Sequence, residues 1–282
     1  NECVINIEMK ILVVGANSYA GAAIYTQLRE KYEVVGTYNA YPLFEELIQL
    51  DITHAEEVER VIKLHAPDTI VHVASNSNGN WCEQHPELAH AINVQATQTL
   101  VEVANTYGAK LVYISSLAAT QGNNVYGKTK AAAEHYVQQT KAGFLILRPS
   151  LLVGFSPNTT NDRPFNRLLK NITHHTPAVY DTSWQFQPTW LRRLCEVIDT
   201  CIAQSLFNHI IPITVPQLCT RYSLAKDILS DFGVTVLAED KKDTTPLFFD
   251  TQDALHALGL PVYSYQQMID GIKEEISNFL RQ

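Results

Sequence analysis

The chain lacks a positive net charge, a long apolar run and a patterned set of cysteines. Its 282 residues carry 21 Lys and Arg against 29 Asp and Glu, a net charge of -8 that gives no general attraction to nucleic acid or anionic membranes. No apolar stretch approaches the roughly 18 residues of a membrane span, and no signal peptide is evident. The cysteines (Cys3, Cys82, Cys195, Cys201 and Cys219) are odd in number and lack metal-ligand spacing, which predicts reduced thiols in a cytoplasmic protein without a metal site.

What is present indicates a globular enzyme whose first half alternates between strands and helices. Hydrophobic residues make up 46% of the chain and charged residues 18%, which leaves ample apolar surface to bury. Apolar runs predict strands over 10–14, 32–38, 48–50, 69–74, 110–115 and 143–147. Helical spacing follows over 20–28, 56–62, 86–103 and 126–139. This alternation predicts a parallel sheet with right-handed crossovers.

The second half has a looser pattern, broken repeatedly by proline. Pro149 marks the change of character, and helices are expected near 164–171, 191–204, 223–231, 252–257 and 265–280. The prediction is an α/β protein: a Rossmann-type doubly wound sheet over residues 9–154 and a smaller α+β substrate lobe over 155–282. Segments of the two domains can interleave.

The turn after the first strand is a candidate phosphate loop. Gly15 and Gly21 match the first and last glycines of a dinucleotide fingerprint, and Ser18 stands at the middle position. A serine hydroxyl can donate to a phosphate, although its Cβ crowds the pyrophosphate. The alternative is a strand-to-helix turn without a ligand. The strand and helix on either side favour a dinucleotide bound by Gly15, Asn17, Ser18, Tyr19, Ala20 and Gly21.

The end of the second strand bears on the choice of cofactor. A carboxylate there would bind the adenosine ribose and an arginine would accept a 2′-phosphate, but the chain has Thr37, Tyr38 and Asn39. The absence of a repelling carboxylate favours NADP(H), and NAD(H) stays open. Asp51 and Ile52 follow the third strand and either border the adenine or, for Asp51, cap the next helix.

A serine, a tyrosine and a lysine form the candidate catalytic group. Lys130 follows Tyr126 by one helical turn, so its ammonium can lower the phenol pKa from about 10 toward neutrality. Ser116 at the end of the preceding strand is the candidate for holding a carbonyl oxygen, with Ser115 as the alternative. The same spacing recurs at Tyr222 and Lys226, where no serine-ended strand precedes it and surface-helix composition is the better explanation.

On these motifs the chain resembles an extended short-chain dehydrogenase/reductase, most of all the dTDP-4-dehydrorhamnose reductase branch. The resemblance implies that Ser116 binds the carbonyl, Tyr126 donates the proton, and Lys130 binds the nicotinamide ribose. It also places Val73, Ala74, Ser75 and Pro149 against the cofactor and Asn93 behind the catalytic helix. The matching stretches are 15–21, 67–74, 82–87, 92–94, 114–116, 126–130 and 147–150, and little matches beyond residue 154 apart from 187–189 and the helix at Tyr222.

Departures from the family narrow the expected chemistry. Only 117–125 separate Ser116 from Tyr126, a shorter insert than is usual, so the substrate pocket must be shaped differently. Dehydratases of this group place acidic residues just after the serine, where this chain has Leu117 and Ala118. The expected function is an NAD(P)H-dependent reductase of a keto-sugar, nucleotide-linked or similar. An NAD-dependent nucleotide-sugar epimerase and a non-catalytic, cofactor-binding regulatory subunit are the alternatives.

Several residues of the second half are weaker candidates. A diphosphate could bind one of Arg163, Arg167, Arg192 and Arg193, although exposed helix faces carry arginines as often. Trp184 and Trp190 could stack on a base, with core packing as the default. His174-His175 is expected to be a solvated loop, and His72 a core histidine. A homodimer is left open.

Overall fold

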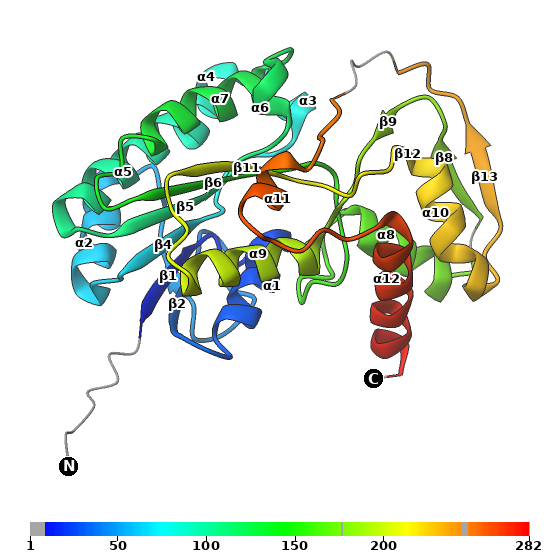
Figure 1. Ribbon diagram of the computed structural model, residues 1–282, viewed down its shortest axis with the longest axis horizontal. Coiled ribbons are helices and arrows are strands. Elements are labelled where there is room, and N and C mark those ends of the chain that lie inside the picture. The colour runs from blue at the N-terminus through cyan, green and yellow to red at the C-terminus, as the bar shows by residue number, and fades with distance from the viewer. Residues whose placement is uncertain (1–8, 176, 244–247, 282) are drawn as a thin grey trace. The chain divides into compact units, whose positions relative to one another are not determined.

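The computed structural model describes residues 9–175, 177–243 and 248–281, so Cys3 lies outside the described residues. The chain divides into two compact units (Figure 1). The first combines the residues up to 147 with 201–210, and the second combines 148–200 with 211–282.

A seven-stranded sheet forms the centre of the first unit. Its order is β11-β6-β5-β4-β1-β2-β3, and β1 pairs in parallel with both β2 and β4. Four of the five side chains of β1 are buried, as expected for a parallel strand covered on both faces. The strands are β1 (Lys10–Val14), β2 (Glu33–Tyr38), β3 (Ile48–Gln49), β4 (Thr69–His72), β5 (Lys110–Ile114), β6 (Phe144–Pro149) and β11 (His209–Ile213). The fold class is the predicted Rossmann-type α/β sheet.

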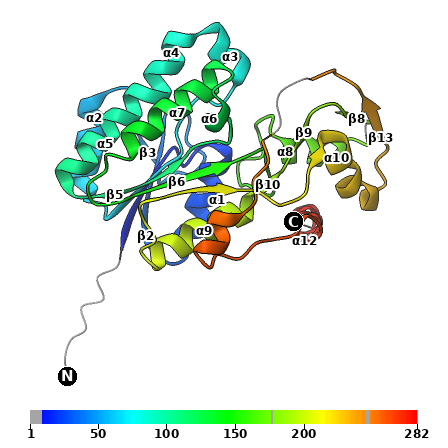
Figure 2. The same cartoon turned by 45° about the horizontal axis from the view of Figure 1, so that its top comes forward.

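Helices cover both faces of this sheet. In Figures 1 and 2, α5 and α7 lie together on one face and α1 lies on the other. A continuous core joins strand residues such as Leu12 and Leu111 to Leu100 of α5 and Val137 of α7, all fully buried. The helices are α1 (Tyr19–Leu28), α2 (Ala55–His65), α3 (Gly79–Gln84), α4 (Pro86–His90), α5 (Ala96–Tyr107), α6 (Ala118–Gln121) and α7 (Val125–Val137).

The predicted helix over 86–103 is present and contains one π-helical turn. The segments α4, η1 (Ala91–Gln95) and α5 follow one another without a break from Pro86 to Tyr107. The wider turn itself was not predicted, because apolar spacing does not distinguish it from a regular helical turn. The short helices α3 and α6 and the return of β11 to the sheet were also not expected from the sequence.

The second unit is built from helices and three two-stranded sheets. Its helices are α8 (Pro164–Thr173), α9 (Leu191–Ala203), α10 (Arg221–Leu229), the 3₁₀ turn η2 (Ser230–Phe232), α11 (Asp253–Ala257) and α12 (Tyr265–Leu280). The paired strands are β7 (Leu152–Val153) with β10 (Thr189–Trp190), β9 (Gln185–Phe186) with β12 (Cys219–Thr220), and β8 (Ala178–Asp181) with β13 (Val236–Glu239). Within the described ranges, no helix combines the length and apolarity that crossing a membrane requires.

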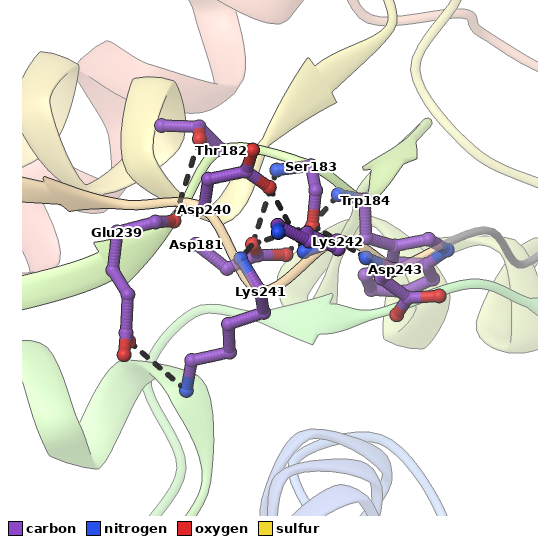
Figure 3. A network of polar contacts seen from close by, with 9 residues as sticks. All are labelled: Asp181, Thr182, Ser183, Trp184, Glu239, Asp240, Lys241, Lys242 and Asp243. Atoms are coloured by element: carbon purple, nitrogen blue, oxygen red, sulfur yellow. Dashed lines mark hydrogen bonds and ion pairs between the residues drawn. The ribbon is translucent and has the colours of Figure 1, made fainter.

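Asp181 joins the ends of β8 and β13 (Figure 3). Its carboxylate accepts hydrogen bonds from the Ser183 amide (3.0 Å) and hydroxyl (2.7 Å), the Trp184 amide (3.1 Å) and the Lys241 amide (3.1 Å). Desolvation opposes the ionised form, but these four hydrogen bonds outweigh it and hold the pKa of Asp181 well below its ordinary value. Asp181 therefore stabilises a parallel strand pair whose members are far apart in the sequence.

Candidate active site

The loop between β1 and α1 has the geometry of a phosphate cradle. Gly15 has a positive φ of 90°, and its amide donates to the Thr37 hydroxyl at 3.1 Å. A Cβ on Gly15 would lie 2.8 Å from the Ala74 nitrogen, and one on Gly21 would lie 2.0 Å from the Gly15 oxygen. Both positions therefore need glycine for the loop to close.

Ser18 has a structural role in this loop. It is the N-cap of α1, where its hydroxyl accepts from the Gly21 amide (3.0 Å) and donates to the Gly15 carbonyl (2.9 Å). Its one proton is thus directed at the backbone, and donation to a phosphate stays a prediction. Tyr19 and Ala20 open α1 with buried side chains, so they would meet a ligand through their amides.

The loop is tied to the segment that follows β2. Asn17 accepts a hydrogen bond from the Leu43 amide at 2.5 Å, which places residues after Tyr38 beside the cradle. Thr37 is buried and Tyr38 is half-buried. The prediction that Asp51 caps α2 is wrong, because His54 occupies the N-cap position and no side chain caps the helix. The Asp51 carboxylate instead accepts from the Thr53 hydroxyl and amide, which lowers the pKa of Asp51. A contact of Asp51 with the adenine stays a prediction.

The end of β4 lies against the same loop. Ala74 closely contacts the Gly15 position, and Val73 and Ser75 flank it. Ile52 is buried. Pro149 is buried at the end of β6 and belongs to the second unit.

Helix α7 carries the candidate acid and its lysine. The helix starts after Asn124, whose side chain accepts from the Gly127 amide at 2.7 Å, and this cap places Tyr126 in the first turn. Tyr126 is half-buried, whereas Lys130 one turn on is 1% exposed. Burial lowers the pKa of Lys130 to about 7, against the opposing influence of Glu134 and Cys82. The duplicate motif differs, because Lys226 is exposed.

The two serines after β5 have different environments. Ser115 is buried and donates to the Glu134 carboxylate at 2.5 Å. Ser116 is half-buried, and its hydroxyl oxygen accepts from the Ala118 amide at 3.2 Å. An acceptor hydroxyl keeps its own proton for another partner, so Ser116 retains a donor for a substrate oxygen.

Asn93 contacts α7, the helix that carries the candidate acid, as the resemblance implied. It lies in the π-helical turn, where its amide nitrogen donates to the Thr129 hydroxyl (3.1 Å) and to the Asn76 carbonyl (3.0 Å). Its side-chain oxygen accepts from the Asn76 amide at 2.8 Å. Asn93 therefore fixes the segment after β4 to α7.

The second unit contains an open pocket with about 660 Å³ of empty space. Arg163, Arg167 and Arg221 line it together with Asp162 and Tyr180. The Arg167 guanidinium forms two hydrogen bonds with Asp162, at 2.6 and 2.7 Å. Burial and then the nearby Arg167 lower the pKa of Arg221, against the opposing influence of Asp181 and Asp243.

Arg192 and Arg193 do not line this pocket. Arg192 pairs with Glu275 at 3.3 Å, and buried Arg193 pairs with Glu196 at 3.2 Å. Trp190 is buried, whereas the Trp184 ring stacks on Phe186 and lies 4.9 Å from the Arg221 guanidinium. The ring nitrogen Nδ1 of His174 lies 3.0 Å from the Lys170 carbonyl oxygen. Among the residues that the structure describes, no three His, Cys, Asp or Glu side chains gather as metal ligands would.

Sequence reasoning missed two residues beside the candidate group and one arginine of the second unit. Glu134 follows Lys130 by one turn, so helical spacing could have identified it. Tyr113 belongs to no recognisable motif but accepts a hydrogen bond from Lys130. Arg221 lines the pocket of the second unit and is 54 positions or more from the other arginines there. The four described cysteines, at 82, 195, 201 and 219, are buried free thiols.

Comparisons with known proteins give one family match and several similar proteins. The model of the RmlD substrate binding domain matches residues 9–248. Methionine adenosyltransferase 2 subunit beta of Xenopus laevis is 33% identical over 161 residues, which cover 51% of this chain and 47% of that protein. A Haloferax volcanii protein named as a glycan biosynthesis reductase is 29% identical over 54% of this chain and 57% of its own. The chain spans about half the length of these curated relatives.

A solved structure shares the whole fold. The dTDP-4-dehydrorhamnose reductase of Bacillus anthracis, solved in complex with NADP, superposes with a TM-score of 0.82. The superposition covers 98% of this chain and 99% of that chain at 21% identity. At this identity the likeness establishes the architecture, and the chemistry must be argued from the residues.

Proposed function

Because the chain belongs to the RmlD substrate-binding-domain family of extended short-chain dehydrogenases/reductases, we propose that it is an NAD(P)H-dependent reductase of a nucleotide-linked keto-sugar. The observation that carries the proposal is the placement of Tyr126 one turn before a buried Lys130. The same unit holds a loop in which a Cβ at Gly15 or Gly21 would collide with backbone. A nicotinamide dinucleotide fits this cradle, since its pyrophosphate needs close backbone approach and the amides of a helix N-terminus.

Each residue of the proposed site has one task. The backbone around Gly15 and Gly21 would bind the pyrophosphate, and Ser116 would donate to the carbonyl oxygen. Tyr126 would then deliver its proton to that oxygen as it becomes an alcohol. Lys130 would stabilise the resulting phenolate. When bound, the cofactor supplies the hydride that the carbonyl carbon accepts.

Three features bear on cofactor and substrate. Thr37 and Tyr38 end β2 where a carboxylate would oppose a 2′-phosphate, which supports NADP(H). Arg163, Arg167 and Arg221 line a pocket of the second unit that suits a diphosphate, since guanidinium groups bind phosphate through paired donors. A nucleotide-linked sugar has this group, and the relative named as a glycan biosynthesis reductase supports a sugar substrate.

Calorimetry with NADPH and NADH tests the proposal first. Wild type and Tyr126→Phe should both bind a cofactor at micromolar strength, since the phenol hydroxyl is needed for proton transfer. Oxidation of the cofactor that binds, NADPH or NADH, is then measured in the presence of a panel of nucleotide-linked keto-sugars. Turnover by wild type and its loss in Tyr126→Phe, with Tyr107→Phe active as the matched control, would support the reductase. A wild-type chain that binds neither cofactor would overturn it.

A non-catalytic regulatory subunit is the second candidate. It is favoured by the likeness to methionine adenosyltransferase 2 subunit beta, a protein named as a subunit of another enzyme. In that case the chain would bind a nicotinamide nucleotide, turn over none of the panel, and co-purify with a methionine adenosyltransferase. Association without turnover would decide for the subunit, and turnover without association for the reductase.

A further inference from the structure

A buried polar contact lies behind the catalytic lysine. The Lys130 ammonium donates to the Tyr113 hydroxyl at 3.0 Å and stands 4.5 Å from the centroid of the same ring. Tyr113 and Lys130 are each 1% exposed, so water does not compete for this contact. The other acceptors of the ammonium are the Ile114 carbonyl at 2.8 Å and the Ser75 hydroxyl at 3.4 Å.

The direction of each hydrogen bond behind Tyr113 follows from the proton count. The Thr97 hydroxyl donates to the Asn93 carbonyl at 2.9 Å, so its oxygen can only accept from its other partners. One partner of that oxygen is the His72 Nε2, 3.0 Å away, which therefore donates to it. The Tyr113 hydroxyl presents a lone pair to the Lys130 ammonium.

We propose that Tyr113 is a positioning residue for Lys130, held in its orientation by the ring of His72 that packs against it. The contact joins β5 to α7 at the candidate lysine. Its catalytic meaning rests on the proposed reductase function, whereas the effect on the ammonium does not.

The side chain that packs behind Tyr113 is uncharged near neutral pH. Burial, and then the nearby Lys130, lower the pKa of His72 to about 3, so its ring is neutral near pH 7. The neutral ring packs against Tyr113 with centroids 5.3 Å apart and adds no second cation beside the ammonium. Other titratable groups surround the pair from three elements: Glu134 and Tyr126 on α7, Cys82 on α3 and His72 on β4.

The Tyr113 oxygen favours the charged form of Lys130. A hydroxyl that accepts from an ammonium stabilises that ammonium relative to the neutral amine. Deleting the oxygen while keeping the ring should therefore lower the pKa of Lys130 further. A role confined to packing would leave this pKa unchanged, because the phenyl ring fills the same space.

NMR of the full chain with ¹³C at the lysine ε-carbons measures this pKa directly. The Lys130 resonance is the one absent from Lys130→Arg. In wild type it should titrate near 7, and in Tyr113→Phe its midpoint should fall by about one unit. Tyr107→Phe deletes the same atom from α5 and should leave the midpoint unchanged, since Tyr107 is hydrogen-bonded to Glu59. A wild-type midpoint retained in a folded Tyr113→Phe would overturn the assignment.

Wild type supplies an independent arm if Tyr113→Phe does not fold. The ¹³Cζ resonance of Tyr113 should change with the same midpoint as Lys130, because the Tyr113 oxygen accepts from the ammonium. A Tyr113 resonance that stays constant through the Lys130 titration would also overturn the proposal. NADPH binding is measured separately on wild type. Its absence together with a shifted midpoint would refute the reductase function while leaving the positioning role intact.

Discussion

The buried hydroxyl of Ser115 donates a hydrogen bond to the Glu134 carboxylate at 2.5 Å. Ser115 follows the last residue of β5, and Glu134 lies one turn beyond Lys130 on α7, so this bond links the end of the strand to that helix. This bond uses the only hydroxyl proton of Ser115. Ser116 is therefore the better candidate to donate a hydrogen bond to a substrate.

The two serines should therefore respond differently to mutation. Ser116→Ala should lower turnover by about 100-fold, in line with the loss of one donor to a developing oxyanion, with stability unchanged. Ser115→Ala should lower the free energy of unfolding by about 1–3 kcal/mol, because buried Glu134 loses a donor. Urea unfolding and turnover per folded molecule separate the two effects. The reverse pattern would make Ser115 the substrate-binding residue.

The phosphate loop should not tolerate a methyl group at Gly21. A Cβ there would lie 2.0 Å from the Gly15 oxygen, so Gly21→Ala must distort the loop and should abolish cofactor binding in calorimetry. Gly79→Ala is the matched control, because no atom lies within 4 Å of the added carbon. Unchanged affinity in Gly21→Ala would mean that the cofactor binds elsewhere.

Asp181 should make the second unit sensitive to acid. Its pKa is depressed in the folded state, so its stabilising contribution is present above the unfolded value of about 3.9 and is lost as the pH falls toward the folded value. Asp181→Asn should be less stable than wild type at pH 7, and the difference should shrink between about pH 4 and pH 2. Urea unfolding across this range measures it. Asp240→Asn, whose side chain accepts only from the Lys242 amide among the contacts of Figure 3, is the control.

Glu275 should be needed to attach α12 to its own unit. Its carboxylate accepts from the Phe155 amide (2.7 Å) and the Trp190 indole (3.1 Å) and pairs with Arg192. Glu275→Ala leaves these donors without their acceptor and should lower the free energy of unfolding by roughly 1–3 kcal/mol. The exposed neighbour Glu274, changed to Ala, should have little effect. Equal denaturation midpoints would show that apolar packing alone retains the helix.

Arg221 should contribute to binding an anionic substrate. Arg221→Ala should raise KM for a nucleotide-linked sugar by about 10-fold, with kcat and cofactor affinity nearly unchanged, because in the proposed function its guanidinium would bind a diphosphate remote from the reacting carbonyl. Arg281→Ala, on the last turn of the chain outside the pocket, is the control for a general loss of positive charge. An unchanged KM would remove the pocket of the second unit from the substrate site.

Local patterns predicted most of the first unit. Period and flanking breakers located six of the seven strands of the sheet, and in the second unit α12 occupies the residues expected for it, 265–280. A capping box formed by Ser264 and Gln267 marks the start of this helix. The start can be predicted from the sequence because the motif spans only four consecutive residues. Gly15, Gly21, Tyr126 and Lys130 were likewise found from short spacings. Their roles in binding and catalysis remain predictions.

The sequence by itself thus determined the strand-helix alternation, the loop and the candidate helix, because each depends on neighbours a few positions apart. Tertiary structure alone decided which residues meet across long separations. Asp181 accepts a hydrogen bond from the Lys241 amide, 60 positions away in the sequence. Strand β11 returns to the sheet beside β6, and Tyr113 accepts a hydrogen bond from Lys130. The physical reason is that burial forces each polar group to find a partner. Which partner lies within reach depends on how strands and helices pack, and not on the order of residues along the chain.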